Sequence, residues 1–298
     1  MIKIIKNEDK NTLRLDKYLK IKFSALTQSF IEKNIRKKNI LVNNSRTSAK
    51  YIIKENDLVK ILNFHSDLYK NKIIFKKNIL IPRKTSELFK KSILFQDQNF
   101  MILNKWPSIA TQGGSKINIS IDDIIKSISP DYRLVHRLDK DTSGLLIVAK
   151  NLNSAKIFGK LFKSSLIQKT YIALCEGKPK QKESNVLLDI KNKEDKIEHT
   201  KTHYKILDVQ NNISLIQYKP LTGKTHQLRI VSKNLGCSII GDNKYNGYSK
   251  FNNEDLKLNA YNLKFIFNDK KYEFFSELSK DFYYFLKKNK FKDLKRYI

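Results

Sequence analysis

Apolar positions near the N-terminus first follow helical spacing and then form short runs. The spacing predicts a short amphipathic helix over 15–21 and a second helix that starts near residue 27 or 29 and ends at 36–38. Short apolar runs at 40–42 and 58–61, with a polar turn between them, predict two strands. Residues 12–62 are therefore expected to form a small domain of two helices packed on a sheet.

The remainder of the chain mixes strand-like and helix-like runs. Residues 63–91 are polar and weakly patterned, so we interpret them as a linker, with one extra strand expected at 73–75. Residues 92–298 are expected to form one larger domain. Its predicted strands are 100–104, 145–149, 171–175, 214–218 and 264–267, and its predicted helices are 121–127, 154–162, 225–234 and 282–298. Several strands follow one another without a helix between them, which favours a mixed α+β fold over a doubly wound parallel sheet.

Charge narrows the class of partner. The chain carries 59 Lys and Arg against 29 Asp and Glu, a formal net charge of +30. Such a surface attracts polyanions, so nucleic acid or an anionic membrane is favoured. The abundance of Lys, Asn and Ile also fits an AT-rich genome, which raises the lysine count without selection for binding. Charge therefore suggests RNA or DNA without locating a site.

Several classes are disfavoured by what the sequence contains. Cys175 and Cys237 are far apart in the chain, which argues against a disulfide framework or a Cys-rich zinc site. The N-terminus becomes polar too early for a signal peptide, and no apolar run has the length of a membrane span. We expect a cytoplasmic protein with no membrane partner.

The segment 133–150, RLVHRLDKDTSGLLIVAK, carries the clearest candidate chemistry. It places Asp139 in a polar turn beside Arg137 and His136, just before an apolar strand. Nearby positive charge favours the ionised carboxylate, which suits a nucleophile or a base. A catalytic triad of His136, Asp139 and Ser143 is disfavoured because triad members normally converge from separate elements. On these residues alone, a structural salt bridge of Asp139 remains an alternative.

The same segment resembles the signature of the RluA-type RNA pseudouridine synthases, through His136-Arg137-Leu138-Asp139-x-x-Thr142-Ser143-Gly144. Three more blocks resemble this family in the same order: 104–114, 169–177 and 221–245. The resemblance implies that Asp139 is the catalytic carboxylate, that Tyr171 lies against the target base and that Arg229 pairs with Asp139. It also implies RNA contacts for Arg137 and His136, with the base flipped out of its stack.

The N-terminal domain resembles the S4 RNA-binding domain. The resemblance depends on Arg14-Leu15-Asp16, Ile35-Arg36, Val42-Asn43 and Asp57. It implies that basic residues grip the RNA backbone, here Arg14, Arg36, Lys37 and Lys38. Asn44 and Asn56 stand where Gly is usual, and Asn tolerates the positive φ that such turns need.

The combined resemblance implies an isomerase that converts uridine to pseudouridine. Substrate and product are isomers, so no cofactor, metal or nucleotide is expected, and we expect a monomer acting on large-subunit ribosomal RNA. The alternatives are a tRNA-directed enzyme and a non-catalytic RNA-binding or ribosome-assembly protein. Trp106 and Val231 depart from the family pattern and put loop shape and target preference in doubt.

Two further motifs are set aside. Gly223-Lys224-Thr225 imitates the end of a P-loop but lacks the required upstream glycine, because residue 218 is Tyr. His199 and His203 have the spacing of a helical metal site, but no HExxH pattern completes it. We interpret these two residues as surface histidines.

Overall fold

The computed structural model describes residues 1–8, 12–70, 80–114, 117–192, 195–247, 249, 251 and 253–297. The chain divides into two compact units, Met1–Asn78 and Ile79–Ile298. Each unit has its own hydrophobic core. The strand expected at 73–75 lies outside the described residues.

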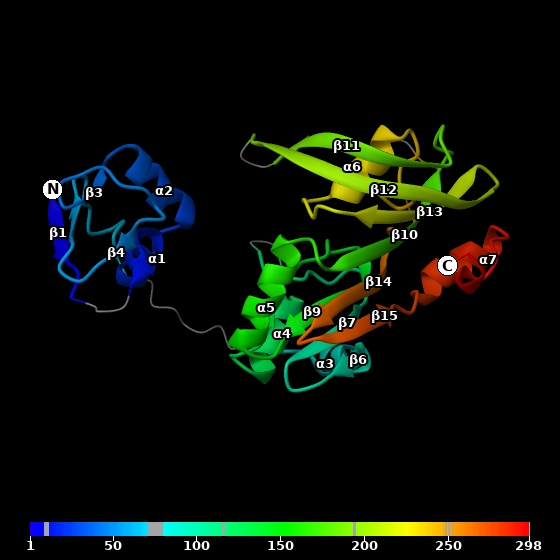
Figure 1. Cartoon of the computed structure of the whole chain (residues 1–298), viewed down its shortest axis with the longest axis horizontal. Coiled ribbons are helices and arrows are strands. Elements are labelled where there is room, and N and C mark those ends of the chain that lie inside the picture. Colours follow the sequence, from blue (N-terminus) through cyan, green and yellow to red (C-terminus); the bar gives the residue numbers. More distant parts are fainter. Residues whose placement is uncertain are drawn as a thin grey trace. The chain divides into compact units, whose positions relative to one another are not determined.

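The first unit packs two helices on a small antiparallel sheet (Figure 1). Its elements are β1 (Lys3–Lys6), β2 (Leu13–Arg14), α1 (Leu15–Lys22), α2 (Gln28–Arg36), β3 (Ile40–Val42), β4 (Ile52–Ile53) and β5 (Leu58–Ile61). The sheet order is β1-β5-β3, and β2 pairs separately with β4. Helix α2 begins after Thr27, whose hydroxyl accepts the backbone N–H of Phe30. The predicted helices and strands of this unit are present, and β1 adds an edge strand that was not predicted.

Asparagines make the tight turns of this sheet. Asn43 and Asn44 have φ of 51° and 61°, and Asn56 has φ of 69°. The Asn43 side chain donates to Asp57 at 2.8 Å and accepts the Leu58 N–H at 2.9 Å, which ties the two turns together. Asn44 and Asn56 thus adopt the positive φ expected where the S4 family usually has glycine.

The segment interpreted as a linker, 63–91, is folded at both of its described ends. Tyr69 is buried in the first unit, with its ring 5.3 Å from that of Phe23. Helix α3 (Arg83–Lys91) belongs to the second unit, where Phe89 is buried. A single polar linker is therefore too broad an interpretation, because the aromatic side chains within it supply buried surface to both cores.

The second unit is built on one ten-stranded mixed sheet. Its order is β11-β12-β13-β10-β14-β9-β7-β6, with β15 paired to β14 and β8 paired to β9. The strands are β6 (Ile93–Gln96), β7 (Phe100–Lys105), β8 (Arg133–Leu134), β9 (Ser143–Ala149), β10 (Gln168–Glu176), β11 (Glu183–Lys191), β12 (Ile197–Gln210), β13 (Ile213–Pro220), β14 (Leu258–Phe267) and β15 (Lys270–Phe275). The ladder between β9 and β14 is parallel and the others are antiparallel. The predicted α+β class is confirmed.

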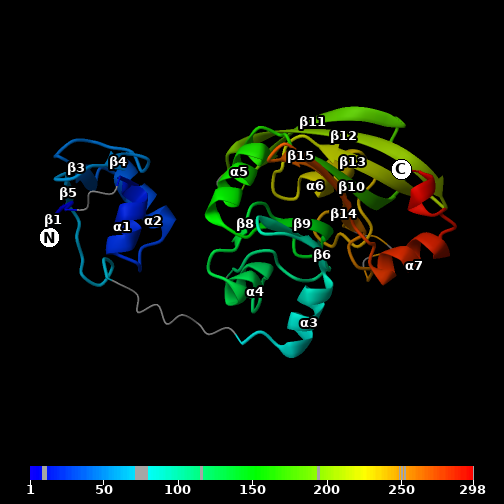
Figure 2. The same cartoon turned by 60° about the horizontal axis from the view of Figure 1, so that its bottom comes forward.

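Helices cover both faces of this sheet (Figure 2). They are α4 (Ile121–Ile128), α5 (Leu152–Lys163), α6 (Gln227–Asn234) and α7 (Lys280–Lys288), followed by a short 3-10 turn at Leu294–Arg296. One face packs alternate strand residues against α6 at one end and against α3 and α4 at the other. The opposite face packs the intervening residues against α7 and α5. Tyr171 contacts both clusters of the first face, so it marks their junction.

Gly144 allows the two halves of the sheet to meet. It has φ of 107° and pairs with Ala260 where β9 runs beside β14. A Cβ at this position would lie 2.4 Å from the Ala260 carbonyl oxygen. Only glycine fits this close approach, which explains the glycine of the Thr142-Ser143-Gly144 motif in physical terms.

Within the described residues, no helix combines the length and apolar character needed to cross a bilayer.

Candidate active site

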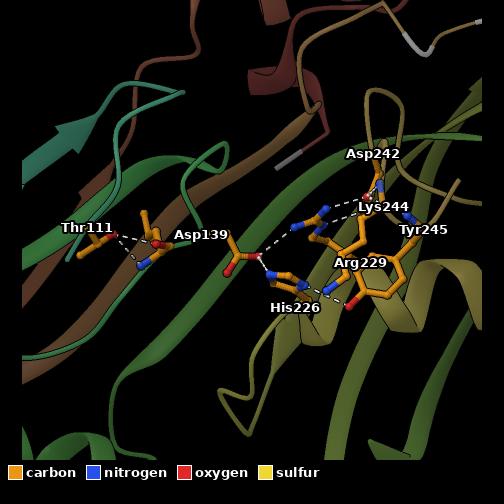
Figure 3. A network of polar contacts seen from close by, with 8 residues as sticks. Thr111, Asp139, His226, Arg229, Asp242, Lys244 and Tyr245 are labelled. Carbon is orange, nitrogen blue, oxygen red and sulfur yellow. Dashed lines mark hydrogen bonds and ion pairs between the residues drawn. The ribbon is translucent and has the colours of Figure 1, made fainter. Parts of the chain in front are cut away.

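Asp139 lies in the loop between β8 and β9, with 27% of its side chain exposed. Its Oδ2 is 3.6 Å from Nη1 of Arg229 and 3.9 Å from Nε2 of His226 (Figure 3). Both partners come from the start of α6. The structure therefore places Asp139 and Arg229 together, as expected, and adds His226, which was not predicted.

A second carboxylate fixes Arg229. Its Nε and Nη2 donate to Asp242 at 2.8 and 2.7 Å, a two-point ion pair in which Asp242 is 1% exposed (Figure 3). Asp242 also accepts the backbone N–H groups of Lys244 and Tyr245. Burial acts against the charge of Arg229, but the Asp242 hydrogen bonds prevail and raise its pKa. Arg229 is thus a permanently charged group that presents its remaining Nη1 to Asp139.

His226 connects the carboxylate to Tyr245. Its Nδ1 shares a 3.0 Å hydrogen bond with the Tyr245 hydroxyl, and its backbone is left-handed, with φ of 55°. This conformation is unfavourable for a non-glycine residue by about 1–2 kcal/mol, so surrounding contacts must hold it. Burial lowers the pKa of His226, and the charge of Asp139 opposes that shift. The motif 221–230 contains His226, but a sequence does not show that this histidine faces Asp139.

Two buried side chains hold the loop on either side of Asp139. Thr111 donates its hydroxyl to the Leu138 carbonyl at 2.7 Å and accepts the Leu138 N–H at 3.1 Å (Figure 3). Lys105 is fully buried, and its Nζ donates to the carbonyls of Lys140, Ile109 and Trp106. Burial lowers the pKa of Lys105 to about 7. The backbone at 138 and 140 is thereby fixed, which limits where the Asp139 carboxylate can point.

Thr111→Val should loosen this loop without changing its volume. Leu138 would lose two buried partners, so we expect a loss of about 1–3 kcal/mol in the free energy of unfolding. Misplacement of Asp139 should also lower kcat by about tenfold or more. Urea unfolding and single-turnover kinetics measure the two effects. Thr111→Ser keeps the hydroxyl and should retain most activity. A fully active Thr111→Val enzyme would show that the two hydrogen bonds between Thr111 and Leu138 are not needed for catalysis.

Tyr171 lies on β10 and lines the same cavity as Asp139. This cavity has a volume of about 100 Å³, and it adjoins a wider groove of about 980 Å³ that shares Arg137, Asp139 and Tyr171. Burial, with a contribution from Asp139, raises the pKa of Tyr171, so the phenol stays neutral. A small cavity with an aromatic wall beside a carboxylate can accept one flipped base and stack against it.

Arg137 and His136 take different positions. Arg137 is exposed and lines both the cavity and the groove, which suits an RNA contact. His136 lines the groove, but its Nε2 accepts the Ile147 N–H at 2.8 Å and its ring lies 4.7 Å from that of Phe162. His136 is therefore engaged in holding β9, whereas a direct RNA contact remains a prediction.

His136→Gln should weaken the acid sensitivity of the fold. Burial, with a contribution from nearby Lys169, lowers the pKa of His136 to about 3. An unfolded His binds its proton near pH 6.5, so the unfolded state gains protons first as the pH falls toward 3. The free energy of unfolding should then fall by up to about 1.4 kcal/mol per pH unit in that window. Urea titrations between pH 7 and 4 should show a flatter profile for His136→Gln, whose amide oxygen can still accept the Ile147 N–H; parallel profiles would contradict this role.

The departures from the family pattern lie beside the site. Beside Trp106, Ser108 stands where the family commonly has Gly, and it has φ of 65°, a conformation that favours glycine at this turn. Trp106 packs against the cluster that includes Ile109 and Leu138, and Val231 is fully buried on α6. These residues shape the scaffold of the site, and their side chains do not line the cavity.

The two histidines considered as metal ligands lie on strand β12 and not on a helix. His199 pairs with Asp189 at 2.6 Å, and His203 pairs with Glu183 at 3.0 Å. Among the residues that the structure describes, no group of three His, Cys, Asp or Glu side chains could hold a metal ion.

The basic residues expected to grip RNA in the first unit lie at two places. Arg36, Lys37 and Lys38 are exposed at the end of α2. Arg14 is engaged with Asp16 through two hydrogen bonds of 3.1 and 2.6 Å. The cluster 36–38 therefore presents three charges to solvent, whereas the charge of Arg14 is already balanced.

The mixed sheet, with a carboxylate and a buried arginine beside a base-sized cavity, has the features of an RNA base-modifying enzyme. Residues 99–234 match the model of the RNA pseudouridylate synthase family, and residues 13–59 match that of the S4 domain. The chain belongs to the RNA pseudouridylate synthase family, whose members isomerise uridine in RNA, and it carries an S4 domain.

Named relatives extend the match over most of the chain. It is 38% identical to ribosomal large subunit pseudouridine synthase C of Rickettsia bellii, over 80% of this chain and 86% of that protein. It is 30% identical to the protein of the same name from Haemophilus influenzae, over 87% and 85%. The fold resembles that of human RNA pseudouridylate synthase domain containing 4, with a TM-score of 0.62 at 23% identity over 70% of this chain and 96% of that one.

Proposed function

We propose that this enzyme converts uridine to pseudouridine in large-subunit ribosomal RNA, as a cytoplasmic monomer without a nucleotide cofactor. The observation that carries the proposal is the arrangement Asp139–Arg229–Asp242 at a cavity walled by Tyr171. The names of relatives in Rickettsia bellii and Haemophilus influenzae support the large-subunit target. The first unit, Met1–Asn78, contains the S4 domain and supplies additional RNA contacts.

In the proposed mechanism, Asp139 is the catalytic carboxylate. The N1–C1′ bond of uridine breaks, the uracil turns in the cavity, and a C5–C1′ bond forms. The proton lost from C5 is balanced by the proton gained at N1. Charge develops at C1′ as the first bond breaks, and a carboxylate beside it can stabilise that charge. Arg229 keeps the carboxylate aimed, and Tyr171 stacks on the detached base.

Tritium release tests the activity and the target together. Large-subunit rRNA transcribed with C5-tritiated uridine should lose label to water in the presence of the enzyme, whereas tRNA transcripts should lose little. Release of tritium from tRNA alone would show that tRNA, and not large-subunit rRNA, is the substrate. RNA binding without release from either substrate would favour a non-catalytic RNA-binding or ribosome-assembly protein and overturn the proposal.

The cluster Arg36, Lys37 and Lys38 should supply part of the salt-dependent binding. Replacing all three by Gln should reduce the slope of log K against log salt by about 2–3, because each phosphate contact contributes roughly 0.7–0.9. Filter binding from low to moderate salt measures the slope. Replacement of Arg14, whose charge Asp16 already balances, should change the slope less. An unchanged slope in the triple variant would show that these three residues of the first domain do not contribute to the salt-dependent binding of RNA.

A further inference from the structure

Lys169 is a half-buried cation in the candidate active site. It lies on β10 two residues before Tyr171, so both side chains point to the same face of the sheet. Its ammonium group forms no hydrogen bond or ion pair within the described part of the chain, and burial lowers its pKa. An ammonium group withdrawn from water is unfavourable without a partner. Within the described residues, the Lys169 ammonium therefore lacks an anionic partner, and a bound anion would stabilise its charge.

The neighbouring cations of the cavity are satisfied in other ways. Lys224 pairs with Glu198 at 3.2 Å, and Arg229 is held by Asp242. Arg137 is exposed to water. Lys169 differs from all three, because it is neither paired nor fully hydrated.

The surroundings of Lys169 leave room for a ligand. It lines both the small cavity and the wider groove, so it stands where the two join. Across from it is Gly223, where an added Cβ would lie 3.8 Å from the Lys169 Nζ. The wall facing the ammonium is thus bare backbone, and a larger residue there would narrow the approach.

The position of the Lys169 ammonium favours an RNA phosphate over the uracil base as its anionic partner. Uracil is uncharged until its glycosidic bond breaks, whereas each phosphodiester of RNA carries a permanent charge. A nucleotide whose base occupies the cavity must leave its phosphate near the junction with the groove. We propose that Lys169 binds an RNA phosphate adjacent to the target uridine and so registers that nucleotide over Asp139. This inference depends on the proposed function, because it assumes that RNA is the substrate.

The test compares Lys169→Gln and Lys169→Arg with Lys270→Gln, a matched loss of charge outside both the cavity and the groove. The probe is a large-subunit rRNA fragment, and both its Kd and its single-turnover rate are measured. Lys169→Gln should raise Kd by about tenfold or more, as expected for loss of a charge-assisted contact. It should also reduce the salt slope by roughly 0.7–0.9. Lys169→Arg should retain most of the affinity, and Lys270→Gln should match the wild type.

Neutral methylphosphonate linkages identify the partner atom. A substitution on one side of the target uridine should weaken binding by the wild type but not further weaken binding by Lys169→Gln. Additive losses at both linkages would overturn the proposal. So would an unchanged Kd and salt slope with a lower rate alone, which would assign Lys169 to the departing uracil. These binding readouts do not require turnover, so an enzyme that binds rRNA through Lys169 yet releases no tritium would contradict only the proposed function.

Discussion

Asp139→Asn should abolish isomerisation while leaving the fold and RNA binding intact. The amide has the shape of the carboxylate but cannot supply negative charge at C1′ or accept a proton as a base. We expect the single-turnover rate to fall by at least about 10³-fold. Because Arg229 stays paired with Asp242, no buried charge is stranded. The free energy of unfolding should therefore change by less than about 1 kcal/mol.

Tritium release under single-turnover conditions, with Kd and thermal unfolding measured on the same preparations, tests this expectation. Asp141→Asn is the matched control, because Asp141 is an exposed carboxylate in the same loop that does not line the cavity. It should retain near-normal turnover. If Asp139→Asn kept more than a tenth of the wild-type rate with Kd unchanged, the catalytic assignment would be wrong.

Most helices, with the exception of α3, and most central strands could be predicted because their buried faces repeat at regular intervals. The runs at 100–104, 145–149 and 171–175 became β7, β9 and β10 with small extensions. The long hairpin of β11 and β12 was missed because the exposed Leu187 and Ile197 break the alternation of apolar and polar residues that would mark a strand with one buried face. Their pairing depends on cross-strand contacts, which local hydrophobicity does not reveal.

The sequence motifs predicted which residues belong to the site, but they did not predict most of the contacts between them. The pairing of Asp139 with Arg229 was expected, and the structure brings the two side chains together. The clamp by Thr111 and the approach of His226 depend on how distant segments meet at the junction of the sheet. Asp242 belongs to a recognisable block, but its role as the partner of Arg229 follows only from the geometry.

Arg229→Met should damage both stability and activity. It leaves the carboxylate of Asp242 buried without its partner, for which we expect a loss of about 3–5 kcal/mol in the free energy of unfolding. It also removes the cation facing Asp139, so the rate should fall by about 10²-fold or more. Denaturant unfolding and single-turnover tritium release measure the two effects, with turnover assayed below the lowered melting temperature.

The double variant Arg229→Met with Asp242→Asn separates these effects. The amide that replaces the Asp242 carboxylate carries no charge and can still accept the N–H groups of Lys244 and Tyr245, so most of the lost stability should return. Activity should stay low, because nothing replaces the cation beside Asp139. Recovery of turnover along with stability would mean that Arg229 acts only through the fold. A stable but inactive double variant would instead show that Arg229 acts on the Asp139 carboxylate. The buried ion pair with Asp242 then serves to orient the Arg229 cation toward Asp139.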